Sequence, residues 1–495
     1  MRKATGTFLP LIAVDRRSPQ PLHRQVYDAF RAAIASRGLA PAQQIPSTRL
    51  LASELGISRI PVLNAYSQLL AEGYFETRVG AGTFVSSSLP EQIEEPQQIP
   101  SVARTKSRPR PIARLASRLP SYEPTPWLRG LGAFSVSQPA LDAFPLKIWA
   151  NLVARRCRNP LTSSLQYGDP MGLRDLREAI AVYLRTSRAV RCERDQIIVV
   201  SGSQQALDLA ARVLLEPSTA AWIEEPGYWL ARHVLMASGC RIVPVPVDEE
   251  GLDVRAGIKK CGNARAAFIA PSHQYPLGVT MSASRRFQLL DWARRSGSWV
   301  VEDDYDSEYR YDSKPIASLQ GLDDTSRVIY MGTFSKVLFP SLRAGYIVPP
   351  PDLVDRFLAM RHAMDVSPGY FYQAVLAEFI AEGHFSRHIR RMRTLYAERR
   401  AKLVECLGRE FGSSMQLMGT QAGMHLCMKL PKGFIDYKIS AEAARQNLWL
   451  WPLSPTYMGK SPQHGFILGF GNTTTAEMPT VVGHLAALLD KRSGF

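Results

Sequence analysis

A lysine and an acidic cluster each follow an apolar run in the C-terminal half of the chain. Lys336 comes shortly after Val328–Tyr330, and Asp303 and Tyr305 come shortly after Trp299–Val301. A lysine amine held in a dry pocket near an anion site is what a Schiff-base cofactor requires. Asp303 and Tyr305 are two residues apart, so their side chains point the same way on an extended chain. This spacing suits a pyridine ring.

Pyridoxal phosphate needs four kinds of partner besides the lysine: an acid, a hydroxyl, an anion cradle and an aromatic face. Asp303 would keep the ring nitrogen protonated through its opposite charge, and Tyr305 would bond the ring oxygen O3′. The turn that begins at Ser201 follows one apolar run and opens a helix, where N–H groups favour a phosphate. The remaining candidates are Ser201, Gly202, Ser203, Gln204, Thr333 and Arg343 for the phosphate, and Tyr228 for stacking on the ring.

Apolar runs alternate with helical stretches from about residue 130 onward. The runs are 197–200, 221–223, 266–269, 299–301 and 328–330. This alternation predicts an α/β domain with a parallel sheet wrapped by helices. Ligands of such sheets bind beyond the carboxyl ends of the strands, and the candidate residues lie there.

The first 85 residues have a different pattern, which predicts three helices and a hairpin. An apolar stripe at every fourth residue after Pro21 marks the first helix. Ser47 can cap a second helix over 48–55, and Ser58 can cap a third that ends near Glu72. Gly80 and Gly82 then supply the permissive turn between two short strands. We expect a helix-turn-helix with a wing, a small α+β domain.

A proline-rich, basic segment separates the two patterns. Residues 86–126 contain eight prolines and a basic run over 104–118, a composition typical of an extended linker. We therefore expect a DNA-binding domain over 1–85, a linker over 86–126 and a cofactor-binding domain over 127–495. The last domain would have a large part over about 150–365 and a small part over about 366–495.

Composition restricts the class of protein. The net charge of +16 and the pI near 9.7 favour polyanionic partners such as nucleic acid. The six cysteines form no CxxC pair, so we expect packed thiols in a reducing cytosol and no metal site. No apolar run of about 18 residues occurs, which predicts a cytoplasmic protein outside the membrane.

The N-terminal segments IPSTRLLASELGISR and AYSQLLAEGYFETRVGAGTFV resemble the winged helix-turn-helix of GntR-type transcription regulators. The resemblance implies that Arg49, Ser58 and Arg59 face double-stranded operator DNA and that the wing from Gly80 to Gly82 approaches the phosphates or the minor groove. An arginine at the start of the recognition helix reaches guanine in the major groove. Two alternatives stay open: Ser58 is only a cap, and Tyr66 is either a phosphate contact or core. Pro61 departs from the family's usual threonine.

The C-terminal segments SGSQQALDL, EEPGYW, PSHQYPLG, VEDDYDSEYRY and GTFSKVLFPSLRAGY resemble the fold-type-I aminotransferase domain, most closely as MocR regulators carry it. The resemblance implies a head-to-tail homodimer with pyridoxal phosphate on Lys336. It places Tyr167 at the phosphate of the neighbouring subunit. His273 lies in a loop beside the ring and is a further candidate neighbour of the cofactor.

One departure bears on function. Aminotransferases hold the substrate carboxylate with an arginine near the C-terminal strand, but no arginine occurs between Gln446 and Asp490. Ile467 or Leu468 stands roughly at that place, and Lys460 or an upstream arginine could substitute for the clamp. The missing clamp favours a regulator that senses pyridoxal phosphate or an amine effector, that controls vitamin B6 or amino-compound metabolism, and that has vestigial or weak aminotransferase activity at most. The alternative is an active aminotransferase with an autoregulatory DNA-binding head.

Overall fold

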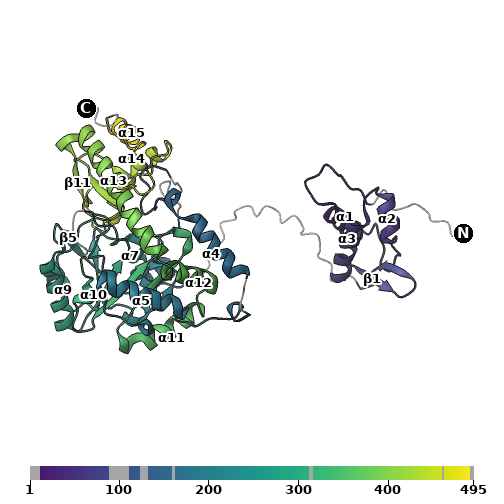
Figure 1. The fold of residues 1–495 in the computed structure, drawn as a ribbon, viewed down its shortest axis with the longest axis horizontal. Coiled ribbons are helices and arrows are strands. Elements are labelled where there is room, and N and C mark those ends of the chain that lie inside the picture. Colours follow the sequence, from purple (N-terminus) through teal and green to yellow (C-terminus); the bar gives the residue numbers. More distant parts are fainter. Residues whose placement is uncertain are drawn as a thin grey trace. The chain divides into compact units, whose positions relative to one another are not determined.

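The structure, a computed structural model, describes residues 12–88, 111–122, 132–158, 162–311, 316–459 and 462–490. The chain divides into two compact units, Met1–Pro111 and Ile112–Phe495, and Figure 1 shows that each has its own helices and strands. Much of the predicted linker and its end at residue 126 lie outside the described residues. The finer domain boundaries therefore stay predictions.

The N-terminal unit consists of three helices and a hairpin. The elements are α1 (Leu22–Ala35), α2 (Thr48–Glu54), α3 (Arg59–Ala71), β1 (Phe75–Arg78) and β2 (Gly82–Val85), and the strands are antiparallel. Ser47 begins α2, and its side chain accepts a hydrogen bond from a backbone N–H of the first turn. Phe30, Tyr66 and Phe75 meet edge to face in the core, with ring centroids 5.2–5.5 Å apart. The predicted winged helix-turn-helix is confirmed.

The C-terminal unit is built on an eight-stranded sheet. In spatial order its strands are β3 (Ile198–Val200), β10 (Gly345–Val348), β9 (Val328–Thr333), β8 (Trp299–Asp304), β7 (Ala266–Ile269), β4 (Ala220–Glu225), β5 (Arg241–Asp248) and β6 (Gly251–Leu252). The strands β9, β8, β7, β4 and β5 are parallel, as expected. The complete sheet is mixed, because β10 runs antiparallel to both neighbours and β6 to β5. Short connections cause both reversals, since antiparallel neighbours need no crossover helix.

Helices cover both faces of this sheet. They are α4 (Leu146–Arg158), α5 (Arg174–Arg188), α6 (Ser203–Leu214), α7 (Trp229–Ala237), α8 (Val254–Cys261), α9 (Ala283–Ser296), α10 (Leu319–Leu322), α11 (Val354–Asp365) and α12 (Tyr370–Ala381). Successive strand residues point to opposite faces: Ile223 packs with α6, α7 and α11, whereas Trp222 packs with α8 and α9. Trp222 stacks on Trp292 at 3.8 Å between ring centroids.

A smaller sheet follows toward the C-terminus. Its order is β11 (Gln416–Met418), β12 (His425–Lys429), β14 (Gly465–Gly469) and β13 (Trp451–Pro452), and its helices are α13 (His384–Phe411), α14 (Asp436–Ala444) and α15 (Met478–Asp490). Figure 1 shows these elements, in green to yellow, beside the larger sheet. Five cysteines are buried as predicted, but Cys157 is exposed because it lies on the outer face of α4. Among the described residues, no helix is both long and apolar enough to cross a membrane.

The start of the C-terminal unit is attached to α7. The short 3₁₀ turn η1 (Ala116–Arg118) packs against α7. Leu115 lies so close to Gly239, just beyond the end of α7, that a side chain at Gly239 would overlap it. The last part of the predicted linker therefore belongs structurally to the C-terminal unit.

Candidate functional site

A cavity of about 250 Å³ opens where the larger sheet meets the smaller one. Ser203, Tyr228, Asp303, Tyr305 and Lys336 all line it, although they come from four different segments. Asp303 lies near the carboxyl end of β8, and Lys336 follows the carboxyl end of β9. Because β8 and β9 are parallel neighbours, both residues lie at the same edge of the sheet. The structure thus places together the lysine, the acid, the hydroxyl and the aromatic ring that the sequence predicted.

The anion cradle forms around Gly202, which precedes α6. Gly202 has φ +104°, and a Cβ added there would lie 3.5 Å from Nη1 of Arg343 and 3.8 Å from Oγ1 of Thr333. Ser203 begins α6, a helix of 12 residues whose free N–H groups favour an anion. A glycine with positive φ that lies beside a guanidinium and a hydroxyl, at the start of a helix, fits a phosphate group.

Two other residues of this turn have different partners. The backbone N–H of Ser201 donates to the side chain of Gln205, and the Gln204 side chain donates to the carbonyl oxygen of Leu230. Gln204 therefore ties α6 to α7, and its direct contact with a phosphate stays a prediction.

Burial shifts the pKa values of the two central groups toward each other. Removal from water lowers the pKa of Lys336 to about 8, and Asp303 and Asp306 only partly offset this. Removal from water also raises the pKa of Asp303 to about 7, with a further contribution from Asp304 and Asp306. Oδ1 of Asp303 is buried without a hydrogen-bond partner. A buried, unpaired carboxylate oxygen fits the protonated ring nitrogen of pyridoxal phosphate.

His273 and Asp306 form a buried pair behind Tyr305. Nδ1 of His273 lies 3.0 Å from each carboxylate oxygen of Asp306 and 3.1 Å from the Tyr305 hydroxyl. Because Asp306 only accepts, the proton of His273 resides on Nδ1. The Tyr305 hydroxyl then cannot donate to this nitrogen, and its proton is available to the cavity. His273 thus contacts Tyr305, and its direct contact with the cofactor stays a prediction.

The same pair lies beside a second histidine. The rings of His273 and His425 are 4.7 Å apart, and burial, followed by the neighbouring His273, lowers the pKa of His425 well below its usual value. One ligand atom from each of His273, Asp306 and His425 lies within 4.8 Å of the others. His273 and Asp306 bond each other, whereas Nε2 of His273 and Nε2 of His425 are buried without a hydrogen-bond partner among the described residues.

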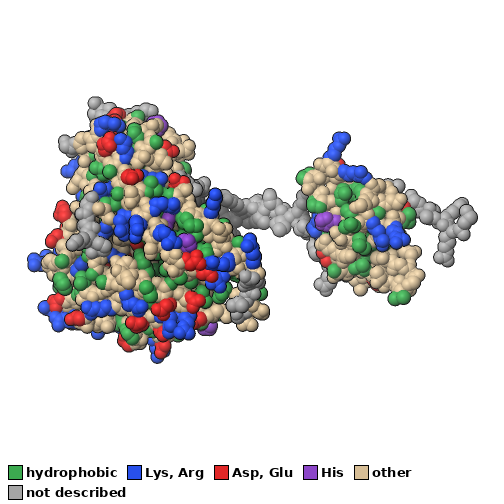
Figure 2. Space-filling model, viewed as in Figure 1, with side chains coloured by type: hydrophobic (Ala, Val, Ile, Leu, Met, Phe, Trp, Pro, Cys, Tyr) green, Lys and Arg blue, Asp and Glu red, His purple; other side chains and the backbone are tan. Residues whose placement is uncertain are grey.

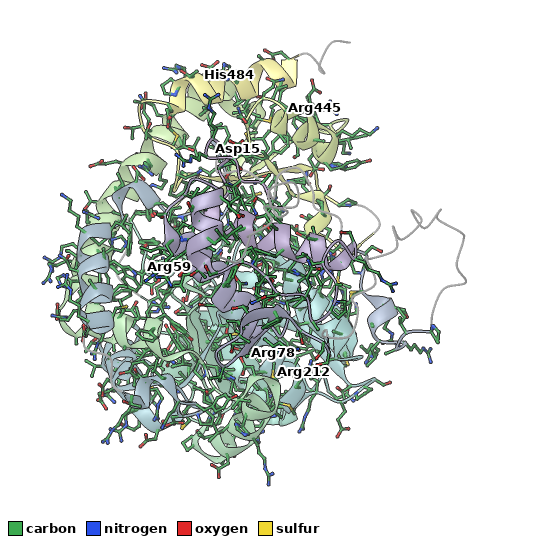
Figure 3. All side chains as sticks on the ribbon, turned by 90° about the vertical axis from the view of Figure 1, so that its right-hand side faces the viewer. Asp15, Arg59, Arg78, Arg212, Arg445 and His484 are labelled. Atoms are coloured by element: carbon green, nitrogen blue, oxygen red, sulfur yellow. The ribbon has the colours of Figure 1, made fainter. Side chains whose placement is uncertain are left out.

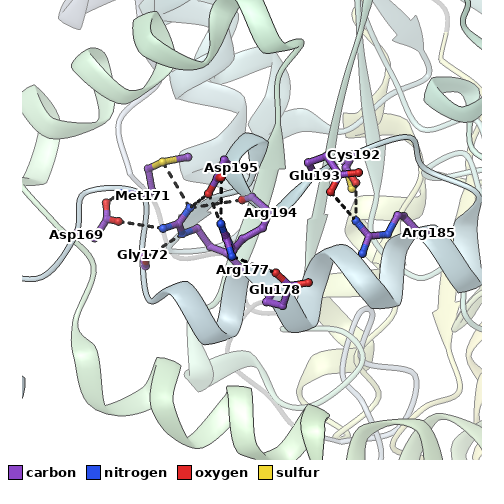
Figure 4. Close-up of polar contacts among 10 residues, drawn as sticks. All are labelled: Asp169, Met171, Gly172, Arg177, Glu178, Arg185, Cys192, Glu193, Arg194 and Asp195. Atoms are coloured by element: carbon purple, nitrogen blue, oxygen red, sulfur yellow. Dashed lines mark hydrogen bonds and ion pairs between the residues drawn. The ribbon is translucent and has the colours of Figure 1, made fainter.

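Tyr167 lies at the surface beside an anchored turn. Arg177 on α5 is buried, donates to the Gly172 carbonyl and forms an ion pair with Asp169 at 3.0 Å (Figure 4). A second ion pair, with Asp195 at 3.2 Å, fixes the other end of the guanidinium. The turn is therefore rigidly held while the Tyr167 ring is 88% exposed.

The structure distinguishes the two residues at the place of the expected arginine. Ile467 is buried with Tyr275 and Leu453, and Tyr228 and Tyr305 pack against this group. Leu468 points to the opposite face of β14, into the core with α13 and α15. Ile467 is therefore the residue on the cofactor side. Lys460 lies outside the described residues.

Sequence reasoning missed several residues of the cavity wall. Glu224, Tyr275, Ser137 and Trp451 all line it. Tyr275 is adjacent to the predicted His273 loop, and its ring meets that of Tyr228 edge to face at 5.8 Å. Ser137 and Trp451 reach the cavity through the tertiary fold, and no local pattern marks them.

The N-terminal unit presents most of its predicted DNA contacts at the surface. Arg49, Ser58, Arg59, Gly80 and Gly82 are exposed. Nε of Arg59 donates to the Thr48 hydroxyl at 3.0 Å, which orients this side chain at the start of α3 (Figure 3). Figure 2 shows lysine and arginine side chains over the visible face of both units, so the net charge of +16 is not confined to the N-terminal unit.

Two residues of the recognition region differ in their roles. Tyr66 is 3% exposed, and its hydroxyl donates to the Pro46 carbonyl oxygen at 3.0 Å. The placement of Tyr66 among DNA contacts is therefore corrected: it is a core residue, because its only donor is already used inside the fold. Ser58 begins α3 without a side-chain cap, which leaves its hydroxyl available to a phosphate.

Two family models match the chain. The model described as bacterial regulatory proteins, gntR family, matches residues 22–85. The model described as aminotransferase class I and II matches residues 134–452, which is more than half of the chain. The second match covers the whole cavity, so pyridoxal phosphate is the cofactor of this domain, and the unpaired Asp303 oxygen and the cradle at Gly202 fit it.

Individual proteins show the same combination. The chain is 39% identical to a probable rhizopine catabolism regulatory protein MocR of Rhizobium meliloti, over 93% of this chain and 92% of that protein. It is 31% identical to a pyridoxine biosynthesis regulator PdxR of Corynebacterium glutamicum, over 93% of this chain and 94% of that protein. Among solved structures, a kynurenine aminotransferase of Pyrococcus horikoshii matches with a TM-score of 0.71 and 26% identity, over 78% of this chain and 98% of that one.

The two regulators match over 93% of this chain, whereas the solved aminotransferase matches over 78% of it. The order of the two domains, the lysine site and the exposed recognition helix all agree with the regulators. The chain therefore belongs to the MocR family, in which a GntR-type winged helix-turn-helix precedes an aminotransferase-like domain.

Proposed function

We propose that this regulator senses pyridoxal phosphate, or an amine that reacts with it, through Lys336 and adjusts operator binding accordingly. One observation carries the proposal: the buried amine of Lys336 faces a buried, unpaired acid in one cavity, in a chain whose other unit exposes Arg59 on a recognition helix. A regulator needs both a ligand site and a DNA surface, and the two occupy separate units.

The cavity residues have distinct tasks. Lys336 would hold the cofactor's aldehyde carbon, Asp303 its ring nitrogen and Tyr305 its ring oxygen. Gly202, Ser203, Thr333 and Arg343 would hold the phosphate, and Tyr228 would stack on the ring. When bound, pyridoxal phosphate supplies a reactive aldehyde and a ring that withdraws electrons from an attached amine. The Asp306–His273 pair keeps the Tyr305 proton directed to the cavity.

Ligand binding controls DNA only if the ligand interacts differently with two arrangements of the heads. We propose a head-to-tail homodimer as the unit in which this occurs. The turn beside Tyr167 supports a homodimer. Its ion pair between Arg177 and Asp169 fixes the turn, and the exposed Tyr167 ring is accessible to a neighbouring subunit. Two heads would then read paired half-sites on operator DNA. The pyridoxine regulator among the relatives supports control of vitamin B6 metabolism as one target.

A working aminotransferase with a DNA-binding head is the second candidate. It is favoured by 30% identity to an aromatic-amino-acid aminotransferase of Thermococcus litoralis, over 62% of this chain. It is opposed by Ile467, since an apolar side chain cannot pair with a substrate carboxylate.

One experiment separates the two candidates. The purified protein loaded with pyridoxal phosphate is incubated with amino donors and keto acids, and product per protein is counted. We expect stoichiometric spectral changes or none, and many turnovers would establish the enzyme instead. In parallel, DNA protection upstream of the protein's own gene is mapped with and without pyridoxal phosphate. Equal affinity for that DNA and for a scrambled sequence would overturn the regulator.

A further inference from the structure

The cavity at Lys336 has walls that suit a particular class of ligand. Val136, Tyr228, Trp229, Tyr275 and Trp451 supply aromatic and apolar surface on several sides. Behind them lies Ile467, fully buried against Tyr275. A ligand that enters beside the cofactor therefore meets rings and aliphatic groups.

Two of the three carboxyl and amine groups that line the cavity are acids. Among the described residues that line the cavity, the ionisable carboxyl and amine groups are Glu224, Asp303 and Lys336. Asp303 is reserved for the ring nitrogen and Lys336 for the aldehyde. Glu224 is 6% exposed, accepts a hydrogen bond from the Ala270 N–H at 3.2 Å and has no role toward the cofactor. Burial raises its pKa to about 8, so it offers a carboxylic acid or a carboxylate, and never a positive charge.

Two arginines that contact neighbouring parts of the site are already engaged. Arg343 faces Gly202 at the phosphate cradle. Arg232 on α7 donates to the carbonyl oxygens of Tyr457 and Pro455, both at 3.3 Å. Among the described residues, a carboxylate in the cavity would thus lose its water without gaining a free arginine partner, which is strongly unfavourable.

We infer that the ligand recognised beside the cofactor is a primary amine without a carboxylate group, and not an α-amino acid. The inference rests on the proposed function and names the effector class. Aromatic walls would hold the carbon chain of the amine, and a carboxyl oxygen of Glu224 would accept a hydrogen bond from its nitrogen. Ile467 would be the residue that sets this specificity, because it lies behind Tyr275 at the place of the expected arginine.

The test compares amines with their carboxylated counterparts. Full-length protein loaded with pyridoxal phosphate is titrated with phenethylamine and L-phenylalanine, isobutylamine and L-valine, and ethanolamine and L-serine, in a buffer without primary amines. The readout is the ligand concentration that gives half of the change in the visible absorbance band. We expect the amine to act at a concentration at least about tenfold lower in one or more pairs, and the amino acid to be preferred in none.

Two results would overturn the inference. One is an amino acid that acts at an equal or lower concentration than its amine. The other is a protein that shows the cofactor band and binds its operator but responds to no amine. The band and operator binding are measured first, so loss of either identifies a failure of the proposed function instead.

A variant pair examines Ile467 directly. Ile467→Arg should lower the concentration of L-phenylalanine required by at least about tenfold and leave phenethylamine no better, because the new guanidinium pairs with a carboxylate. Ile467→Leu, which keeps the wall apolar, should retain the preference for the amine. If Ile467→Arg does not fold, the titrations of the unmodified protein still decide. A folded Ile467→Arg with unchanged preference would exclude Ile467 as the specificity residue.

Discussion

The two units of this chain assemble their binding residues in different ways. In the N-terminal unit, Arg49, Arg59 and the wing glycines come from neighbouring elements and lie at the surface. In the C-terminal unit, Ser203, Asp303 and Lys336 come from distant segments and meet in a cavity. In the buried site, removal from water shifts the pKa of Asp303 upward and that of Lys336 downward. A surface built from local helices suits a polyanion, and a buried site suits covalent chemistry on a small molecule.

The largest effect should come from removing the buried amine. Lys336→Ala should abolish the visible band that pyridoxal phosphate gives with the protein, because no other amine lines the cavity among the described residues. Absorbance spectra and circular dichroism measure the band and the fold. Lys432→Ala, which removes an exposed lysine, is the matched control and should leave the band unchanged. An unaltered spectrum in Lys336→Ala would remove Lys336 from its role.

The rate at which the buried site takes up pyridoxal phosphate should depend on pH. The neutral amine is the reactive form, and burial lowers the pKa of Lys336 to about 8. The rate at which the band forms on adding pyridoxal phosphate to cofactor-free protein should therefore rise with pH and level off above about 8. Below about 7 it should fall about tenfold per pH unit, since the charged amine then predominates. Stopped-flow absorbance measures this rate. A rate that keeps rising to about pH 10 would indicate an ordinary, solvated lysine.

Arg59→Ala should affect the exposed site and leave the buried one intact. We expect specific operator binding to weaken by about 1–3 kcal/mol because a base contact in the major groove is lost. Fluorescence anisotropy with operator and scrambled DNA measures the change. Arg212→Ala, an exposed arginine on α6 in the other unit, is the control. Loss of the cofactor band in Arg59→Ala would contradict the separation of the two sites.

The substitution Gly202→Ala tests whether the turn at Gly202 binds the phosphate group. The residue has φ +104°, where a side chain is strained, and its Cβ would approach Arg343. We expect pyridoxal phosphate affinity to fall several-fold, a cost of about 1 kcal/mol or more. Equilibrium titration of the visible band measures it. Gly408→Ala, in the last turn of α13 where a Cβ meets nothing within 4 Å, should leave affinity unchanged. Equal affinities of the two variants would place the phosphate elsewhere.

Tyr66→Phe should have the smallest effect, and it should change only the stability of the N-terminal unit. Removing the hydroxyl that donates to Pro46 leaves the buried carbonyl oxygen unpaired, at a cost of about 1 kcal/mol to the free energy of unfolding. Urea denaturation measures this cost. DNA affinity should stay unchanged, and a marked loss would restore Tyr66 as a phosphate contact.

Sequence reasoning succeeded where structure is local. Glycines, caps and apolar stripes mark the three helices and the hairpin because each signal acts within a few residues. The end of each parallel strand was also predictable, which is why Asp303 and Lys336 were found. The antiparallel β10 was missed because strand direction depends on the connections between elements.

The residues of the cavity wall could not be predicted from local sequence patterns. Adjacent strand residues point to opposite faces, so an uncertainty of one position left Ile467 and Leu468 equivalent until the register of β14 with β12 was known. Ser137 and Trp451 come from opposite ends of the domain and are joined by the tertiary fold alone. Tyr66 was ambiguous because an aromatic ring at helical spacing serves a core and a surface equally well.

The contact between Leu115 and the end of α7 fixes where the described start of the C-terminal unit is attached. This segment meets the unit at η1, which packs on α7. The first turn of the same helix carries Trp229, Leu230 and Ala231 of the cavity wall. A displacement of η1 would therefore act on a helix that forms part of the cavity wall and not on a remote part of the unit.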